Sequence, residues 1–144
     1  MSPLADEFAP VKARVEAALG TSRTVYGDRA PDDASGAYVV VSTSTGVSGS
    51  TNLAAGIDRR SPVIFVTSVA TAPATSDVSE EQLAGEVRWA MRKVVDALAG
   101  WTPSIGRATF AVEHVVSERP VRDRDVPGLR VMAATDQFIA QYQP

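Results

Sequence analysis

The sequence contains no cysteine, a single histidine and few aromatic residues. Without cysteine the chain cannot form a disulfide, use a thiolate nucleophile or build a cysteine-based zinc site. Its 14 Lys and Arg against 17 Asp and Glu give a net charge of −3, which argues against a basic nucleic-acid-binding surface. No apolar run approaches the roughly 20 residues of a membrane-spanning helix, and the N-terminal segment lacks the apolar core of a signal peptide. We therefore expect a soluble chain made in a cytoplasm-like compartment.

The motifs of common catalytic and cofactor-binding sites are also missing. There is no P-loop and no dinucleotide-binding glycine pattern. The nearest approach to a Gly-x-Ser-x-Gly nucleophile elbow is GVSGS at 46–50, which ends in serine and falls in an expected loop. His114 falls between Val112 and Val116 on one face of an expected strand, which favours a buried, hydrogen-bonded imidazole; a metal site would need Asp or Glu ligands from elsewhere. We predict no catalytic residue, no metal site and no cofactor.

Two segments have the periodicity of amphipathic helices. Apolar residues recur at spacings of three and four over 4–19, where Pro10 either kinks the helix or marks a regular start near residue 8. The second helix is expected over 78–100, where Ser79 and Gln82 form a capping-box pattern. Its buried stripe is predicted to contain Leu83, Val87, Ala90, Met91, Val94 and Leu98. We also expect Trp89, close to that stripe, and Trp101, just after the helix, to pack in the core.

Strands alternate with these helices in the order helix, three strands, long helix, two strands. The expected strands cover 23–27, 37–43, 62–69, 107–117 and 129–142. This order predicts an α+β fold: a single domain over 1–144, with a mostly antiparallel or mixed sheet of about five strands and two helices packed on one face. The stretch 44–61, rich in small polar residues, is expected to be a long flexible loop, and 117–128 a hairpin turn.

The most unusual stretch is the alternating charge run Arg122-Asp123-Arg124-Asp125. In an extended chain the two aspartates would lie on one side, about 7 Å apart, and the two arginines on the other. An acid pair, a solvated hairpin and a contact surface all remain open, and the pattern favours the contact surface. A ribbon with opposite charges on its two sides can pair with copies of itself without burying net charge, and repeated head-to-tail contacts form a ring if the rotation closes.

The order of parts along the chain resembles the tail terminator proteins of long-tailed phages (siphovirus type) of actinobacteria, also called minor tail or tail completion proteins. The resemblance is carried by the segments VEAALG, AYVVVS, the Ser/Thr/Gly-rich loop, PVIFVTSVA, VRWAMRKVVDALAGWTP and RDRDVPGLRVMAATDQF. The Gly100-Trp101 join, followed by Pro103, and the run Arg-Asp-x-Asp-Val-Pro-Gly contribute most. The resemblance covers nearly the whole chain.

The resemblance implies a structural virion protein and not an enzyme. Such proteins form a hexameric ring on the last ring of the tail tube protein, stop tube growth and present a surface to the head-completion or stopper protein. DNA later passes through the lumen without specific binding, which an acidic ring would favour because DNA binding depends on neutralised phosphates. It also implies a place in the virion, at the head-proximal end of the tail, after assembly in the host bacterial cytoplasm, with no membrane partner.

Two groups of residues then become candidates for specific roles. Subunit or partner contacts are expected from the charge run and from the basic pair at the end of the 44–61 loop: Arg122, Asp123, Arg124, Asp125, Arg59 and Arg60. Lumen-facing acids are expected in the turn that holds Asp28, Asp32 and Asp33. A solvated turn and a surface loop without a partner are the alternatives. A head–tail stopper or connector of related fold, or a stand-alone enzyme or small-ligand module, also remain open as functions.

Overall fold

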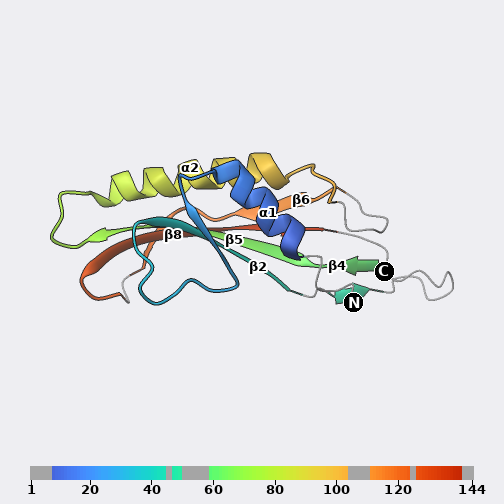
Figure 1. Ribbon diagram of the computed structural model, residues 1–144, viewed down its shortest axis with the longest axis horizontal. Helices are drawn as coiled ribbons and strands as arrows, with labels where there is room; N and C mark the ends of the chain where they lie inside the picture. The colour runs from blue at the N-terminus through green and yellow to red at the C-terminus, as the bar shows by residue number, and fades with distance from the viewer. Residues whose placement is uncertain (1–7, 45–46, 50–58, 104–110, 124–125, 141–144) are drawn as a thin grey trace.

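Two helices lie on the same face of an elongated, twisted sheet in the computed structural model (Figure 1). The structure describes residues 8–44, 47–49, 59–103, 111–123 and 126–140. The helices are α1 (Phe8–Leu19) and α2 (Glu80–Leu98). The strands are β1 (Thr24–Gly27), β2 (Ala37–Thr43), β3 (Val47–Gly49), β4 (Arg59–Ser61), β5 (Val63–Pro73), β6 (Glu113–Ser117), β7 (Val121–Asp123) and β8 (Leu129–Ile139).

The main sheet has six strands in the order β1-β2-β5-β8-β6, and β7 pairs with β8 farther along the same edge as β6. Only the β1–β2 pair is parallel, so the sheet is mixed. The α+β prediction with two helices on one face is confirmed. The sheet has six strands where about five were expected, because β7 forms within the segment predicted as a hairpin turn. Moreover, β3 and β4 pair with each other inside 44–61, which was predicted to be loop throughout.

The helices begin and end where the sequence signals predict. Ser79 caps α2: its hydroxyl accepts a hydrogen bond from the Gln82 amide, and the Gln82 side chain accepts one from the Ser79 amide. All six residues of the predicted buried stripe are buried. The α1 helix starts at Phe8, which places Pro10 in the first turn, where a missing N–H costs no helical hydrogen bond. Neither described helix is long and apolar enough to cross a membrane.

The core lies between the helices and one face of the sheet. On β5, Ile64, Val66 and the alternate residues after them are buried, as two-residue periodicity requires. One apolar cluster combines residues of α1, the C-terminal half of α2 and the sheet. A second cluster lies under the N-terminal half of α2. Two buried polar residues, Ser68 on β5 and Asp136 on β8, share this face of the sheet. The residues of the opposite face are mostly half-buried, and no helix of the described chain packs there.

Candidate assembly interface

One edge of the sheet ends in two short, exposed strands, β6 and β7, which we call the β6–β7 edge. Every residue of both strands is exposed. Val115, Val116 and Val121 are 49%, 48% and 51% exposed, and they are three of the four large hydrophobic side chains that lie exposed in the described chain. An edge strand with exposed apolar side chains can accept another chain. This edge is therefore the candidate contact surface.

The first two residues of the charge run, Arg122 and Asp123, lie on β7 of this edge. Arg122 is paired with Met132, on the helix-facing side of β8, whereas Asp123 is paired with Val131. The two side chains thus belong to opposite sides of the strand. Burial raises the pKa of Tyr38, on the helix-free face, and the charges of Tyr26 and then Asp123 raise it further. Arg124 and Asp125 lie outside the described residues.

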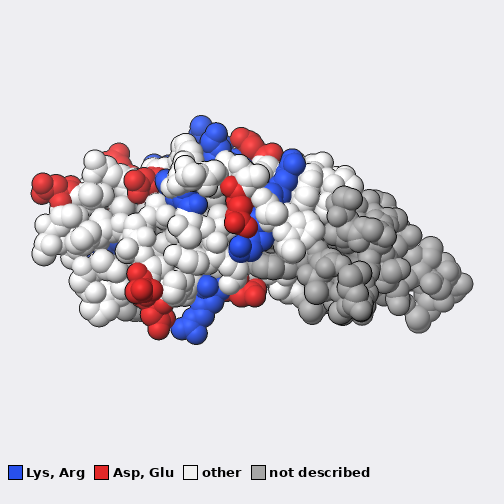
Figure 2. Space-filling model, in the orientation of Figure 1, with Lys and Arg blue, Asp and Glu red and all other residues white. Residues whose placement is uncertain are grey.

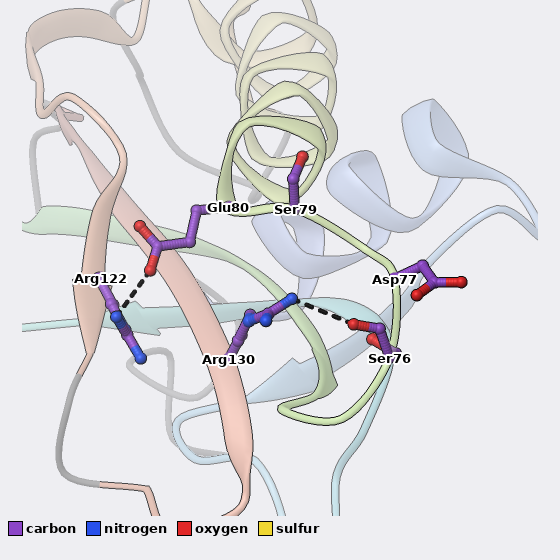
Figure 3. A pocket seen from close by; sticks show the side chains of 6 residues that line it. All are labelled: Ser76, Asp77, Ser79, Glu80, Arg122 and Arg130. Atoms are coloured by element: carbon purple, nitrogen blue, oxygen red, sulfur yellow. Dashed lines mark hydrogen bonds and ion pairs between the residues drawn. The ribbon is translucent and has the colours of Figure 1, made fainter.

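Arg122 also makes a contact within the chain, at a shallow hollow of about 590 Å³ (Figure 3). Its guanidinium lies 2.8 Å from Glu80 Oε1, at the start of α2. Arg130, on β8, donates hydrogen bonds to the carbonyl oxygens of Ser76 and Val78. Both arginines of the hollow therefore join the sheet to the segment that starts α2. The role of Arg122 in a partner contact stays a prediction.

Behind β6 lies a polar cluster of His114, Ser117 and Asp136. The His114 Nε2 atom is 2.9 Å from Ser117 Oγ and 3.4 Å from Asp136 Oδ1, and Ser117 Oγ donates to the same carboxylate oxygen. Asp136 is completely buried, and its Oδ2 atom has no hydrogen-bond partner among the described residues. Burial raises the pKa of Asp136, while the Ser117 hydrogen bond and His114 lower it. The cluster joins β6 to β8.

The prediction for His114 is half wrong. The imidazole is hydrogen-bonded as expected, but its side chain is 29% exposed, since β6 is an edge strand. His114 and Val116 were expected on one face, yet His114 is paired with Phe138 and Val116 with Gln137. The register shifts between the two residues, and a β-bulge of this kind turns the following side chains to the other face.

This cluster differs from a hydrolase triad in its hydrogen bonding. In a triad the aspartate orients the histidine, and the other imidazole nitrogen takes the serine proton. Here Asp136 and the His114 Nε2 atom both contact the Ser117 hydroxyl, so the carboxylate competes with the imidazole for that proton. The residues that the structure describes also contain no group of three potential metal ligands. The arrangement suits a structural polar cluster.

The other predicted site residues are exposed or lie in the small hairpin. Asp28, Asp32 and Asp33 are exposed in the connection from β1 to β2, and Asp32 forms an exposed ion pair with Arg29. Their role in a lumen stays a prediction. Arg59 and Arg60 belong to β4, where they are paired with Gly49 and Ser48. Their role in a partner contact likewise stays a prediction. On the face shown in Figure 2, basic and acidic side chains alternate without forming a broad field of one sign.

Trp89 departs from the prediction. It is 39% exposed on the outer side of α2, with the Arg23 guanidinium 4.8 Å and the Lys93 amine 5.7 Å from its ring centroid. The helical periodicity contained this signal, since the buried stripe leaves Trp89 on the opposite side. Trp101, by contrast, packs half-buried against the core as expected.

The fold resembles that of a protein of known structure. No family model matches the chain, and no curated protein matches it. A solved chain from the virion of a native gene transfer agent (GTA) particle is similar over 97% of this chain and 96% of its own, with a TM-score of 0.66 and 17% sequence identity. At this identity the likeness shows a shared fold.

Proposed function

We propose that this chain is a structural virion protein that forms a ring of six copies on the end of a phage tail tube. The ring ends tube growth and joins the tail to the head-completion proteins. The chain is assembled in the host bacterial cytoplasm and stays at the head-proximal end of the tail. Its partners are further copies of itself, the tail tube protein and the head-completion or stopper protein.

The observation that carries this proposal is the likeness in fold to a chain of the gene transfer agent virion. It extends over nearly the full length of both chains, so the whole fold is shared and not a part of it. The segments quoted above resemble tail terminators in the same order along the chain. A virion role accounts for both observations.

The β6–β7 edge supports a role in assembly. It combines exposed valines with Arg122 and Asp123, the charged residues that begin the alternating run. An apolar contact whose register is set by charged residues is typical of a specific protein interface. The cluster of His114, Ser117 and Asp136 behind this edge joins β6 to β8 and has the arrangement of a structural contact. We infer that the chain functions by binding other proteins and not by catalysis.

The acidic character of the chain suits the passage of DNA. Each copy has a net charge of −3, so a ring of copies repels phosphates and lets DNA slide without binding. The exposed turn with Asp28, Asp32 and Asp33 is our candidate for the lumen.

The proposal can be tested with purified components. The chain is mixed with tubes polymerised from the tail tube protein of the same phage, and the tubes are viewed by negative-stain electron microscopy. We expect rings at the tube ends and a halt to further elongation. Tubes that remain bare and continue to grow would contradict the proposal, and rings that bind only the head-completion protein would indicate a head-side connector.

The double substitution Asp123→Lys/Asp125→Lys should weaken ring assembly and leave the monomer folded, because Asp123 is exposed on an edge strand, where a charge contributes little to monomer stability. Its matched control is Asp32→Lys/Asp33→Lys, which changes the net charge equally at the exposed turn. Equal loss of assembly in both variants would mean that total charge, and not the β6–β7 edge, controls assembly.

A further inference from the structure

The fourth exposed large hydrophobic side chain, Trp89, lies away from the β6–β7 edge and is surrounded by positive charge. Arg23 and Lys93 lie over its ring, and Arg92, one helical turn farther along, is exposed. The nearest acid on the helix is Glu86, one turn before the tryptophan. We call Arg23, Gly85, Trp89, Arg92 and Lys93 the α2 patch. Trp and Arg are the residues most enriched at interface positions that dominate binding.

Gly85 gives this patch a second unusual feature. Glycine inside a helix costs stability relative to alanine, yet a Cβ atom at Gly85 would meet nothing within 4 Å in this chain. The fold of the single chain therefore gives no reason for a glycine here. Helical side chains lean toward the N-terminus, so the Trp89 side chain leans toward the turn that holds Gly85. The glycine leaves room beside the indole for the close approach of another backbone.

The β6–β7 edge has the complementary properties. Its exposed valines match the apolar indole. The exposed residues Glu113 and Glu118 lie at the two ends of β6 and are opposite in charge to the α2 patch, and Glu118 Oε1 also accepts a hydrogen bond from the Thr135 amide. Arg122 on the same edge is paired with Glu80, and among the described residues near β6 and β7 the other arginine is Arg119.

The two surfaces are separate: Trp89 lies exposed on α2, which packs over β5 and β8, whereas the β6–β7 edge is one margin of the sheet. The sheet order places β1 at one edge and β6 at the other. Arg23 directly precedes β1 and reaches Trp89, so the α2 patch is continuous with the β1 edge. Two different surfaces that are complementary produce head-to-tail contacts, which form a ring when the rotation closes.

We propose that the α2 patch of one copy binds the β6–β7 edge of the next copy, and that this contact links the subunits. The inference rests on the proposed function, because it names the surfaces through which the proposed ring is built. Trp89 packs against the exposed valines, Gly85 admits the backbone of the edge strand, and the cations of the patch face Glu113 and Glu118.

Two complementary variants test the contact. The patch variant, Trp89→Ser/Arg92→Glu, damages the α2 patch and keeps the β6–β7 edge; the edge variant, Glu113→Lys/Val116→Lys, does the reverse. All four positions are exposed, and circular dichroism checks that both variants stay folded. Each variant alone should lose assembly at least about tenfold by sedimentation velocity. An equal mixture should form a 1:1 dimer and nothing larger, since one intact interface remains. In that mixture the single remaining Trp89 should become protected from acrylamide quenching.

Two further variants make the test specific. Arg29→Glu matches the charge change at Arg92 but lies at the far end of β1 from Arg23, and it should assemble as the wild type does. Gly85→Ala should raise the melting temperature of the monomer and still weaken assembly.

Three results would overturn the inference: a mixture that stays monomeric while the wild type assembles, either variant assembling alone as well as the wild type, or a wild-type chain that is monomeric even at about 1 mM, where weak contacts are populated. A failure here is distinct from failure of the proposed function, because capping of tail tubes is measured without these variants.

Discussion

Ser117 is exposed on an edge strand, yet its replacement by alanine should destabilise the fold as a core substitution does. Its hydroxyl donates to Asp136 Oδ1, and Asp136 is completely buried. The other carboxylate oxygen has no partner among the described residues, so Ser117→Ala leaves His114 Nε2, 3.4 Å away, as the remaining polar neighbour. Leaving a buried acceptor unsatisfied costs about 1–3 kcal/mol, and more for a charged group. We therefore expect a loss of about 2 kcal/mol at pH 7.

Urea unfolding followed by tryptophan fluorescence measures this loss, with Ser35→Ala as the control. Ser35 is also exposed, and a surface substitution there should change the free energy of unfolding by less than about 0.5 kcal/mol. The cost of Ser117→Ala should shrink as the pH falls through the folded-state pKa of Asp136, because a protonated carboxyl loses less when the hydroxyl is removed. Equal stability of the two variants at pH 7 would refute the role assigned to the cluster.

Four further substitutions give independent checks of the fold. Burial raises the folded-state pKa of Asp136 above its ordinary value of 3.8, so the folded chain binds that proton more tightly than the unfolded chain does. Stability is therefore lost as the pH rises through the folded-state pKa. The substitution Asp136→Asn should remove this loss, which urea unfolding at a series of pH values measures. Val94→Asp places an unpaired charge in the fully buried stripe of α2 and should prevent folding, so a folded, soluble variant by circular dichroism would refute the core assignment. Gly100→Ala should lower the free energy of unfolding by about 1–2 kcal/mol, because Gly100 has φ +79°, whereas Gly85→Ala should raise it by about 1 kcal/mol; thermal melts that rank the two in the opposite order would contradict this.

The helix α2 could be predicted almost completely because its signals are local. The capping box, the buried stripe and Gly100 after the end all lie within the segment itself. The three-residue strands β3, β4 and β7 could not be predicted in this way. Each is defined by its pairing with a strand elsewhere in the chain, and three residues carry too little periodicity to indicate a strand.

At the candidate interface, one feature could have been predicted from the sequence and two could not. Alternation along β8 places Asp136 on the same side as Met132, Ala134 and Phe138, so a buried carboxylate could have been predicted from the sequence. The position of His114 could not, because the register shift before Val116 depends on the contact with β8. The contact of Arg122 with Glu80 joins residues 42 positions apart and likewise depends on the folded sheet.

The central claim is that this chain ends the growth of a phage tail tube. Its most direct test is the tail length, by negative-stain electron microscopy, in lysates of a phage with an early stop codon in the gene for this chain. We predict overlong tubes without caps beside full heads. Tails of normal length that fail to join heads would assign the chain to the head side of the connection, and intact virions would contradict the account.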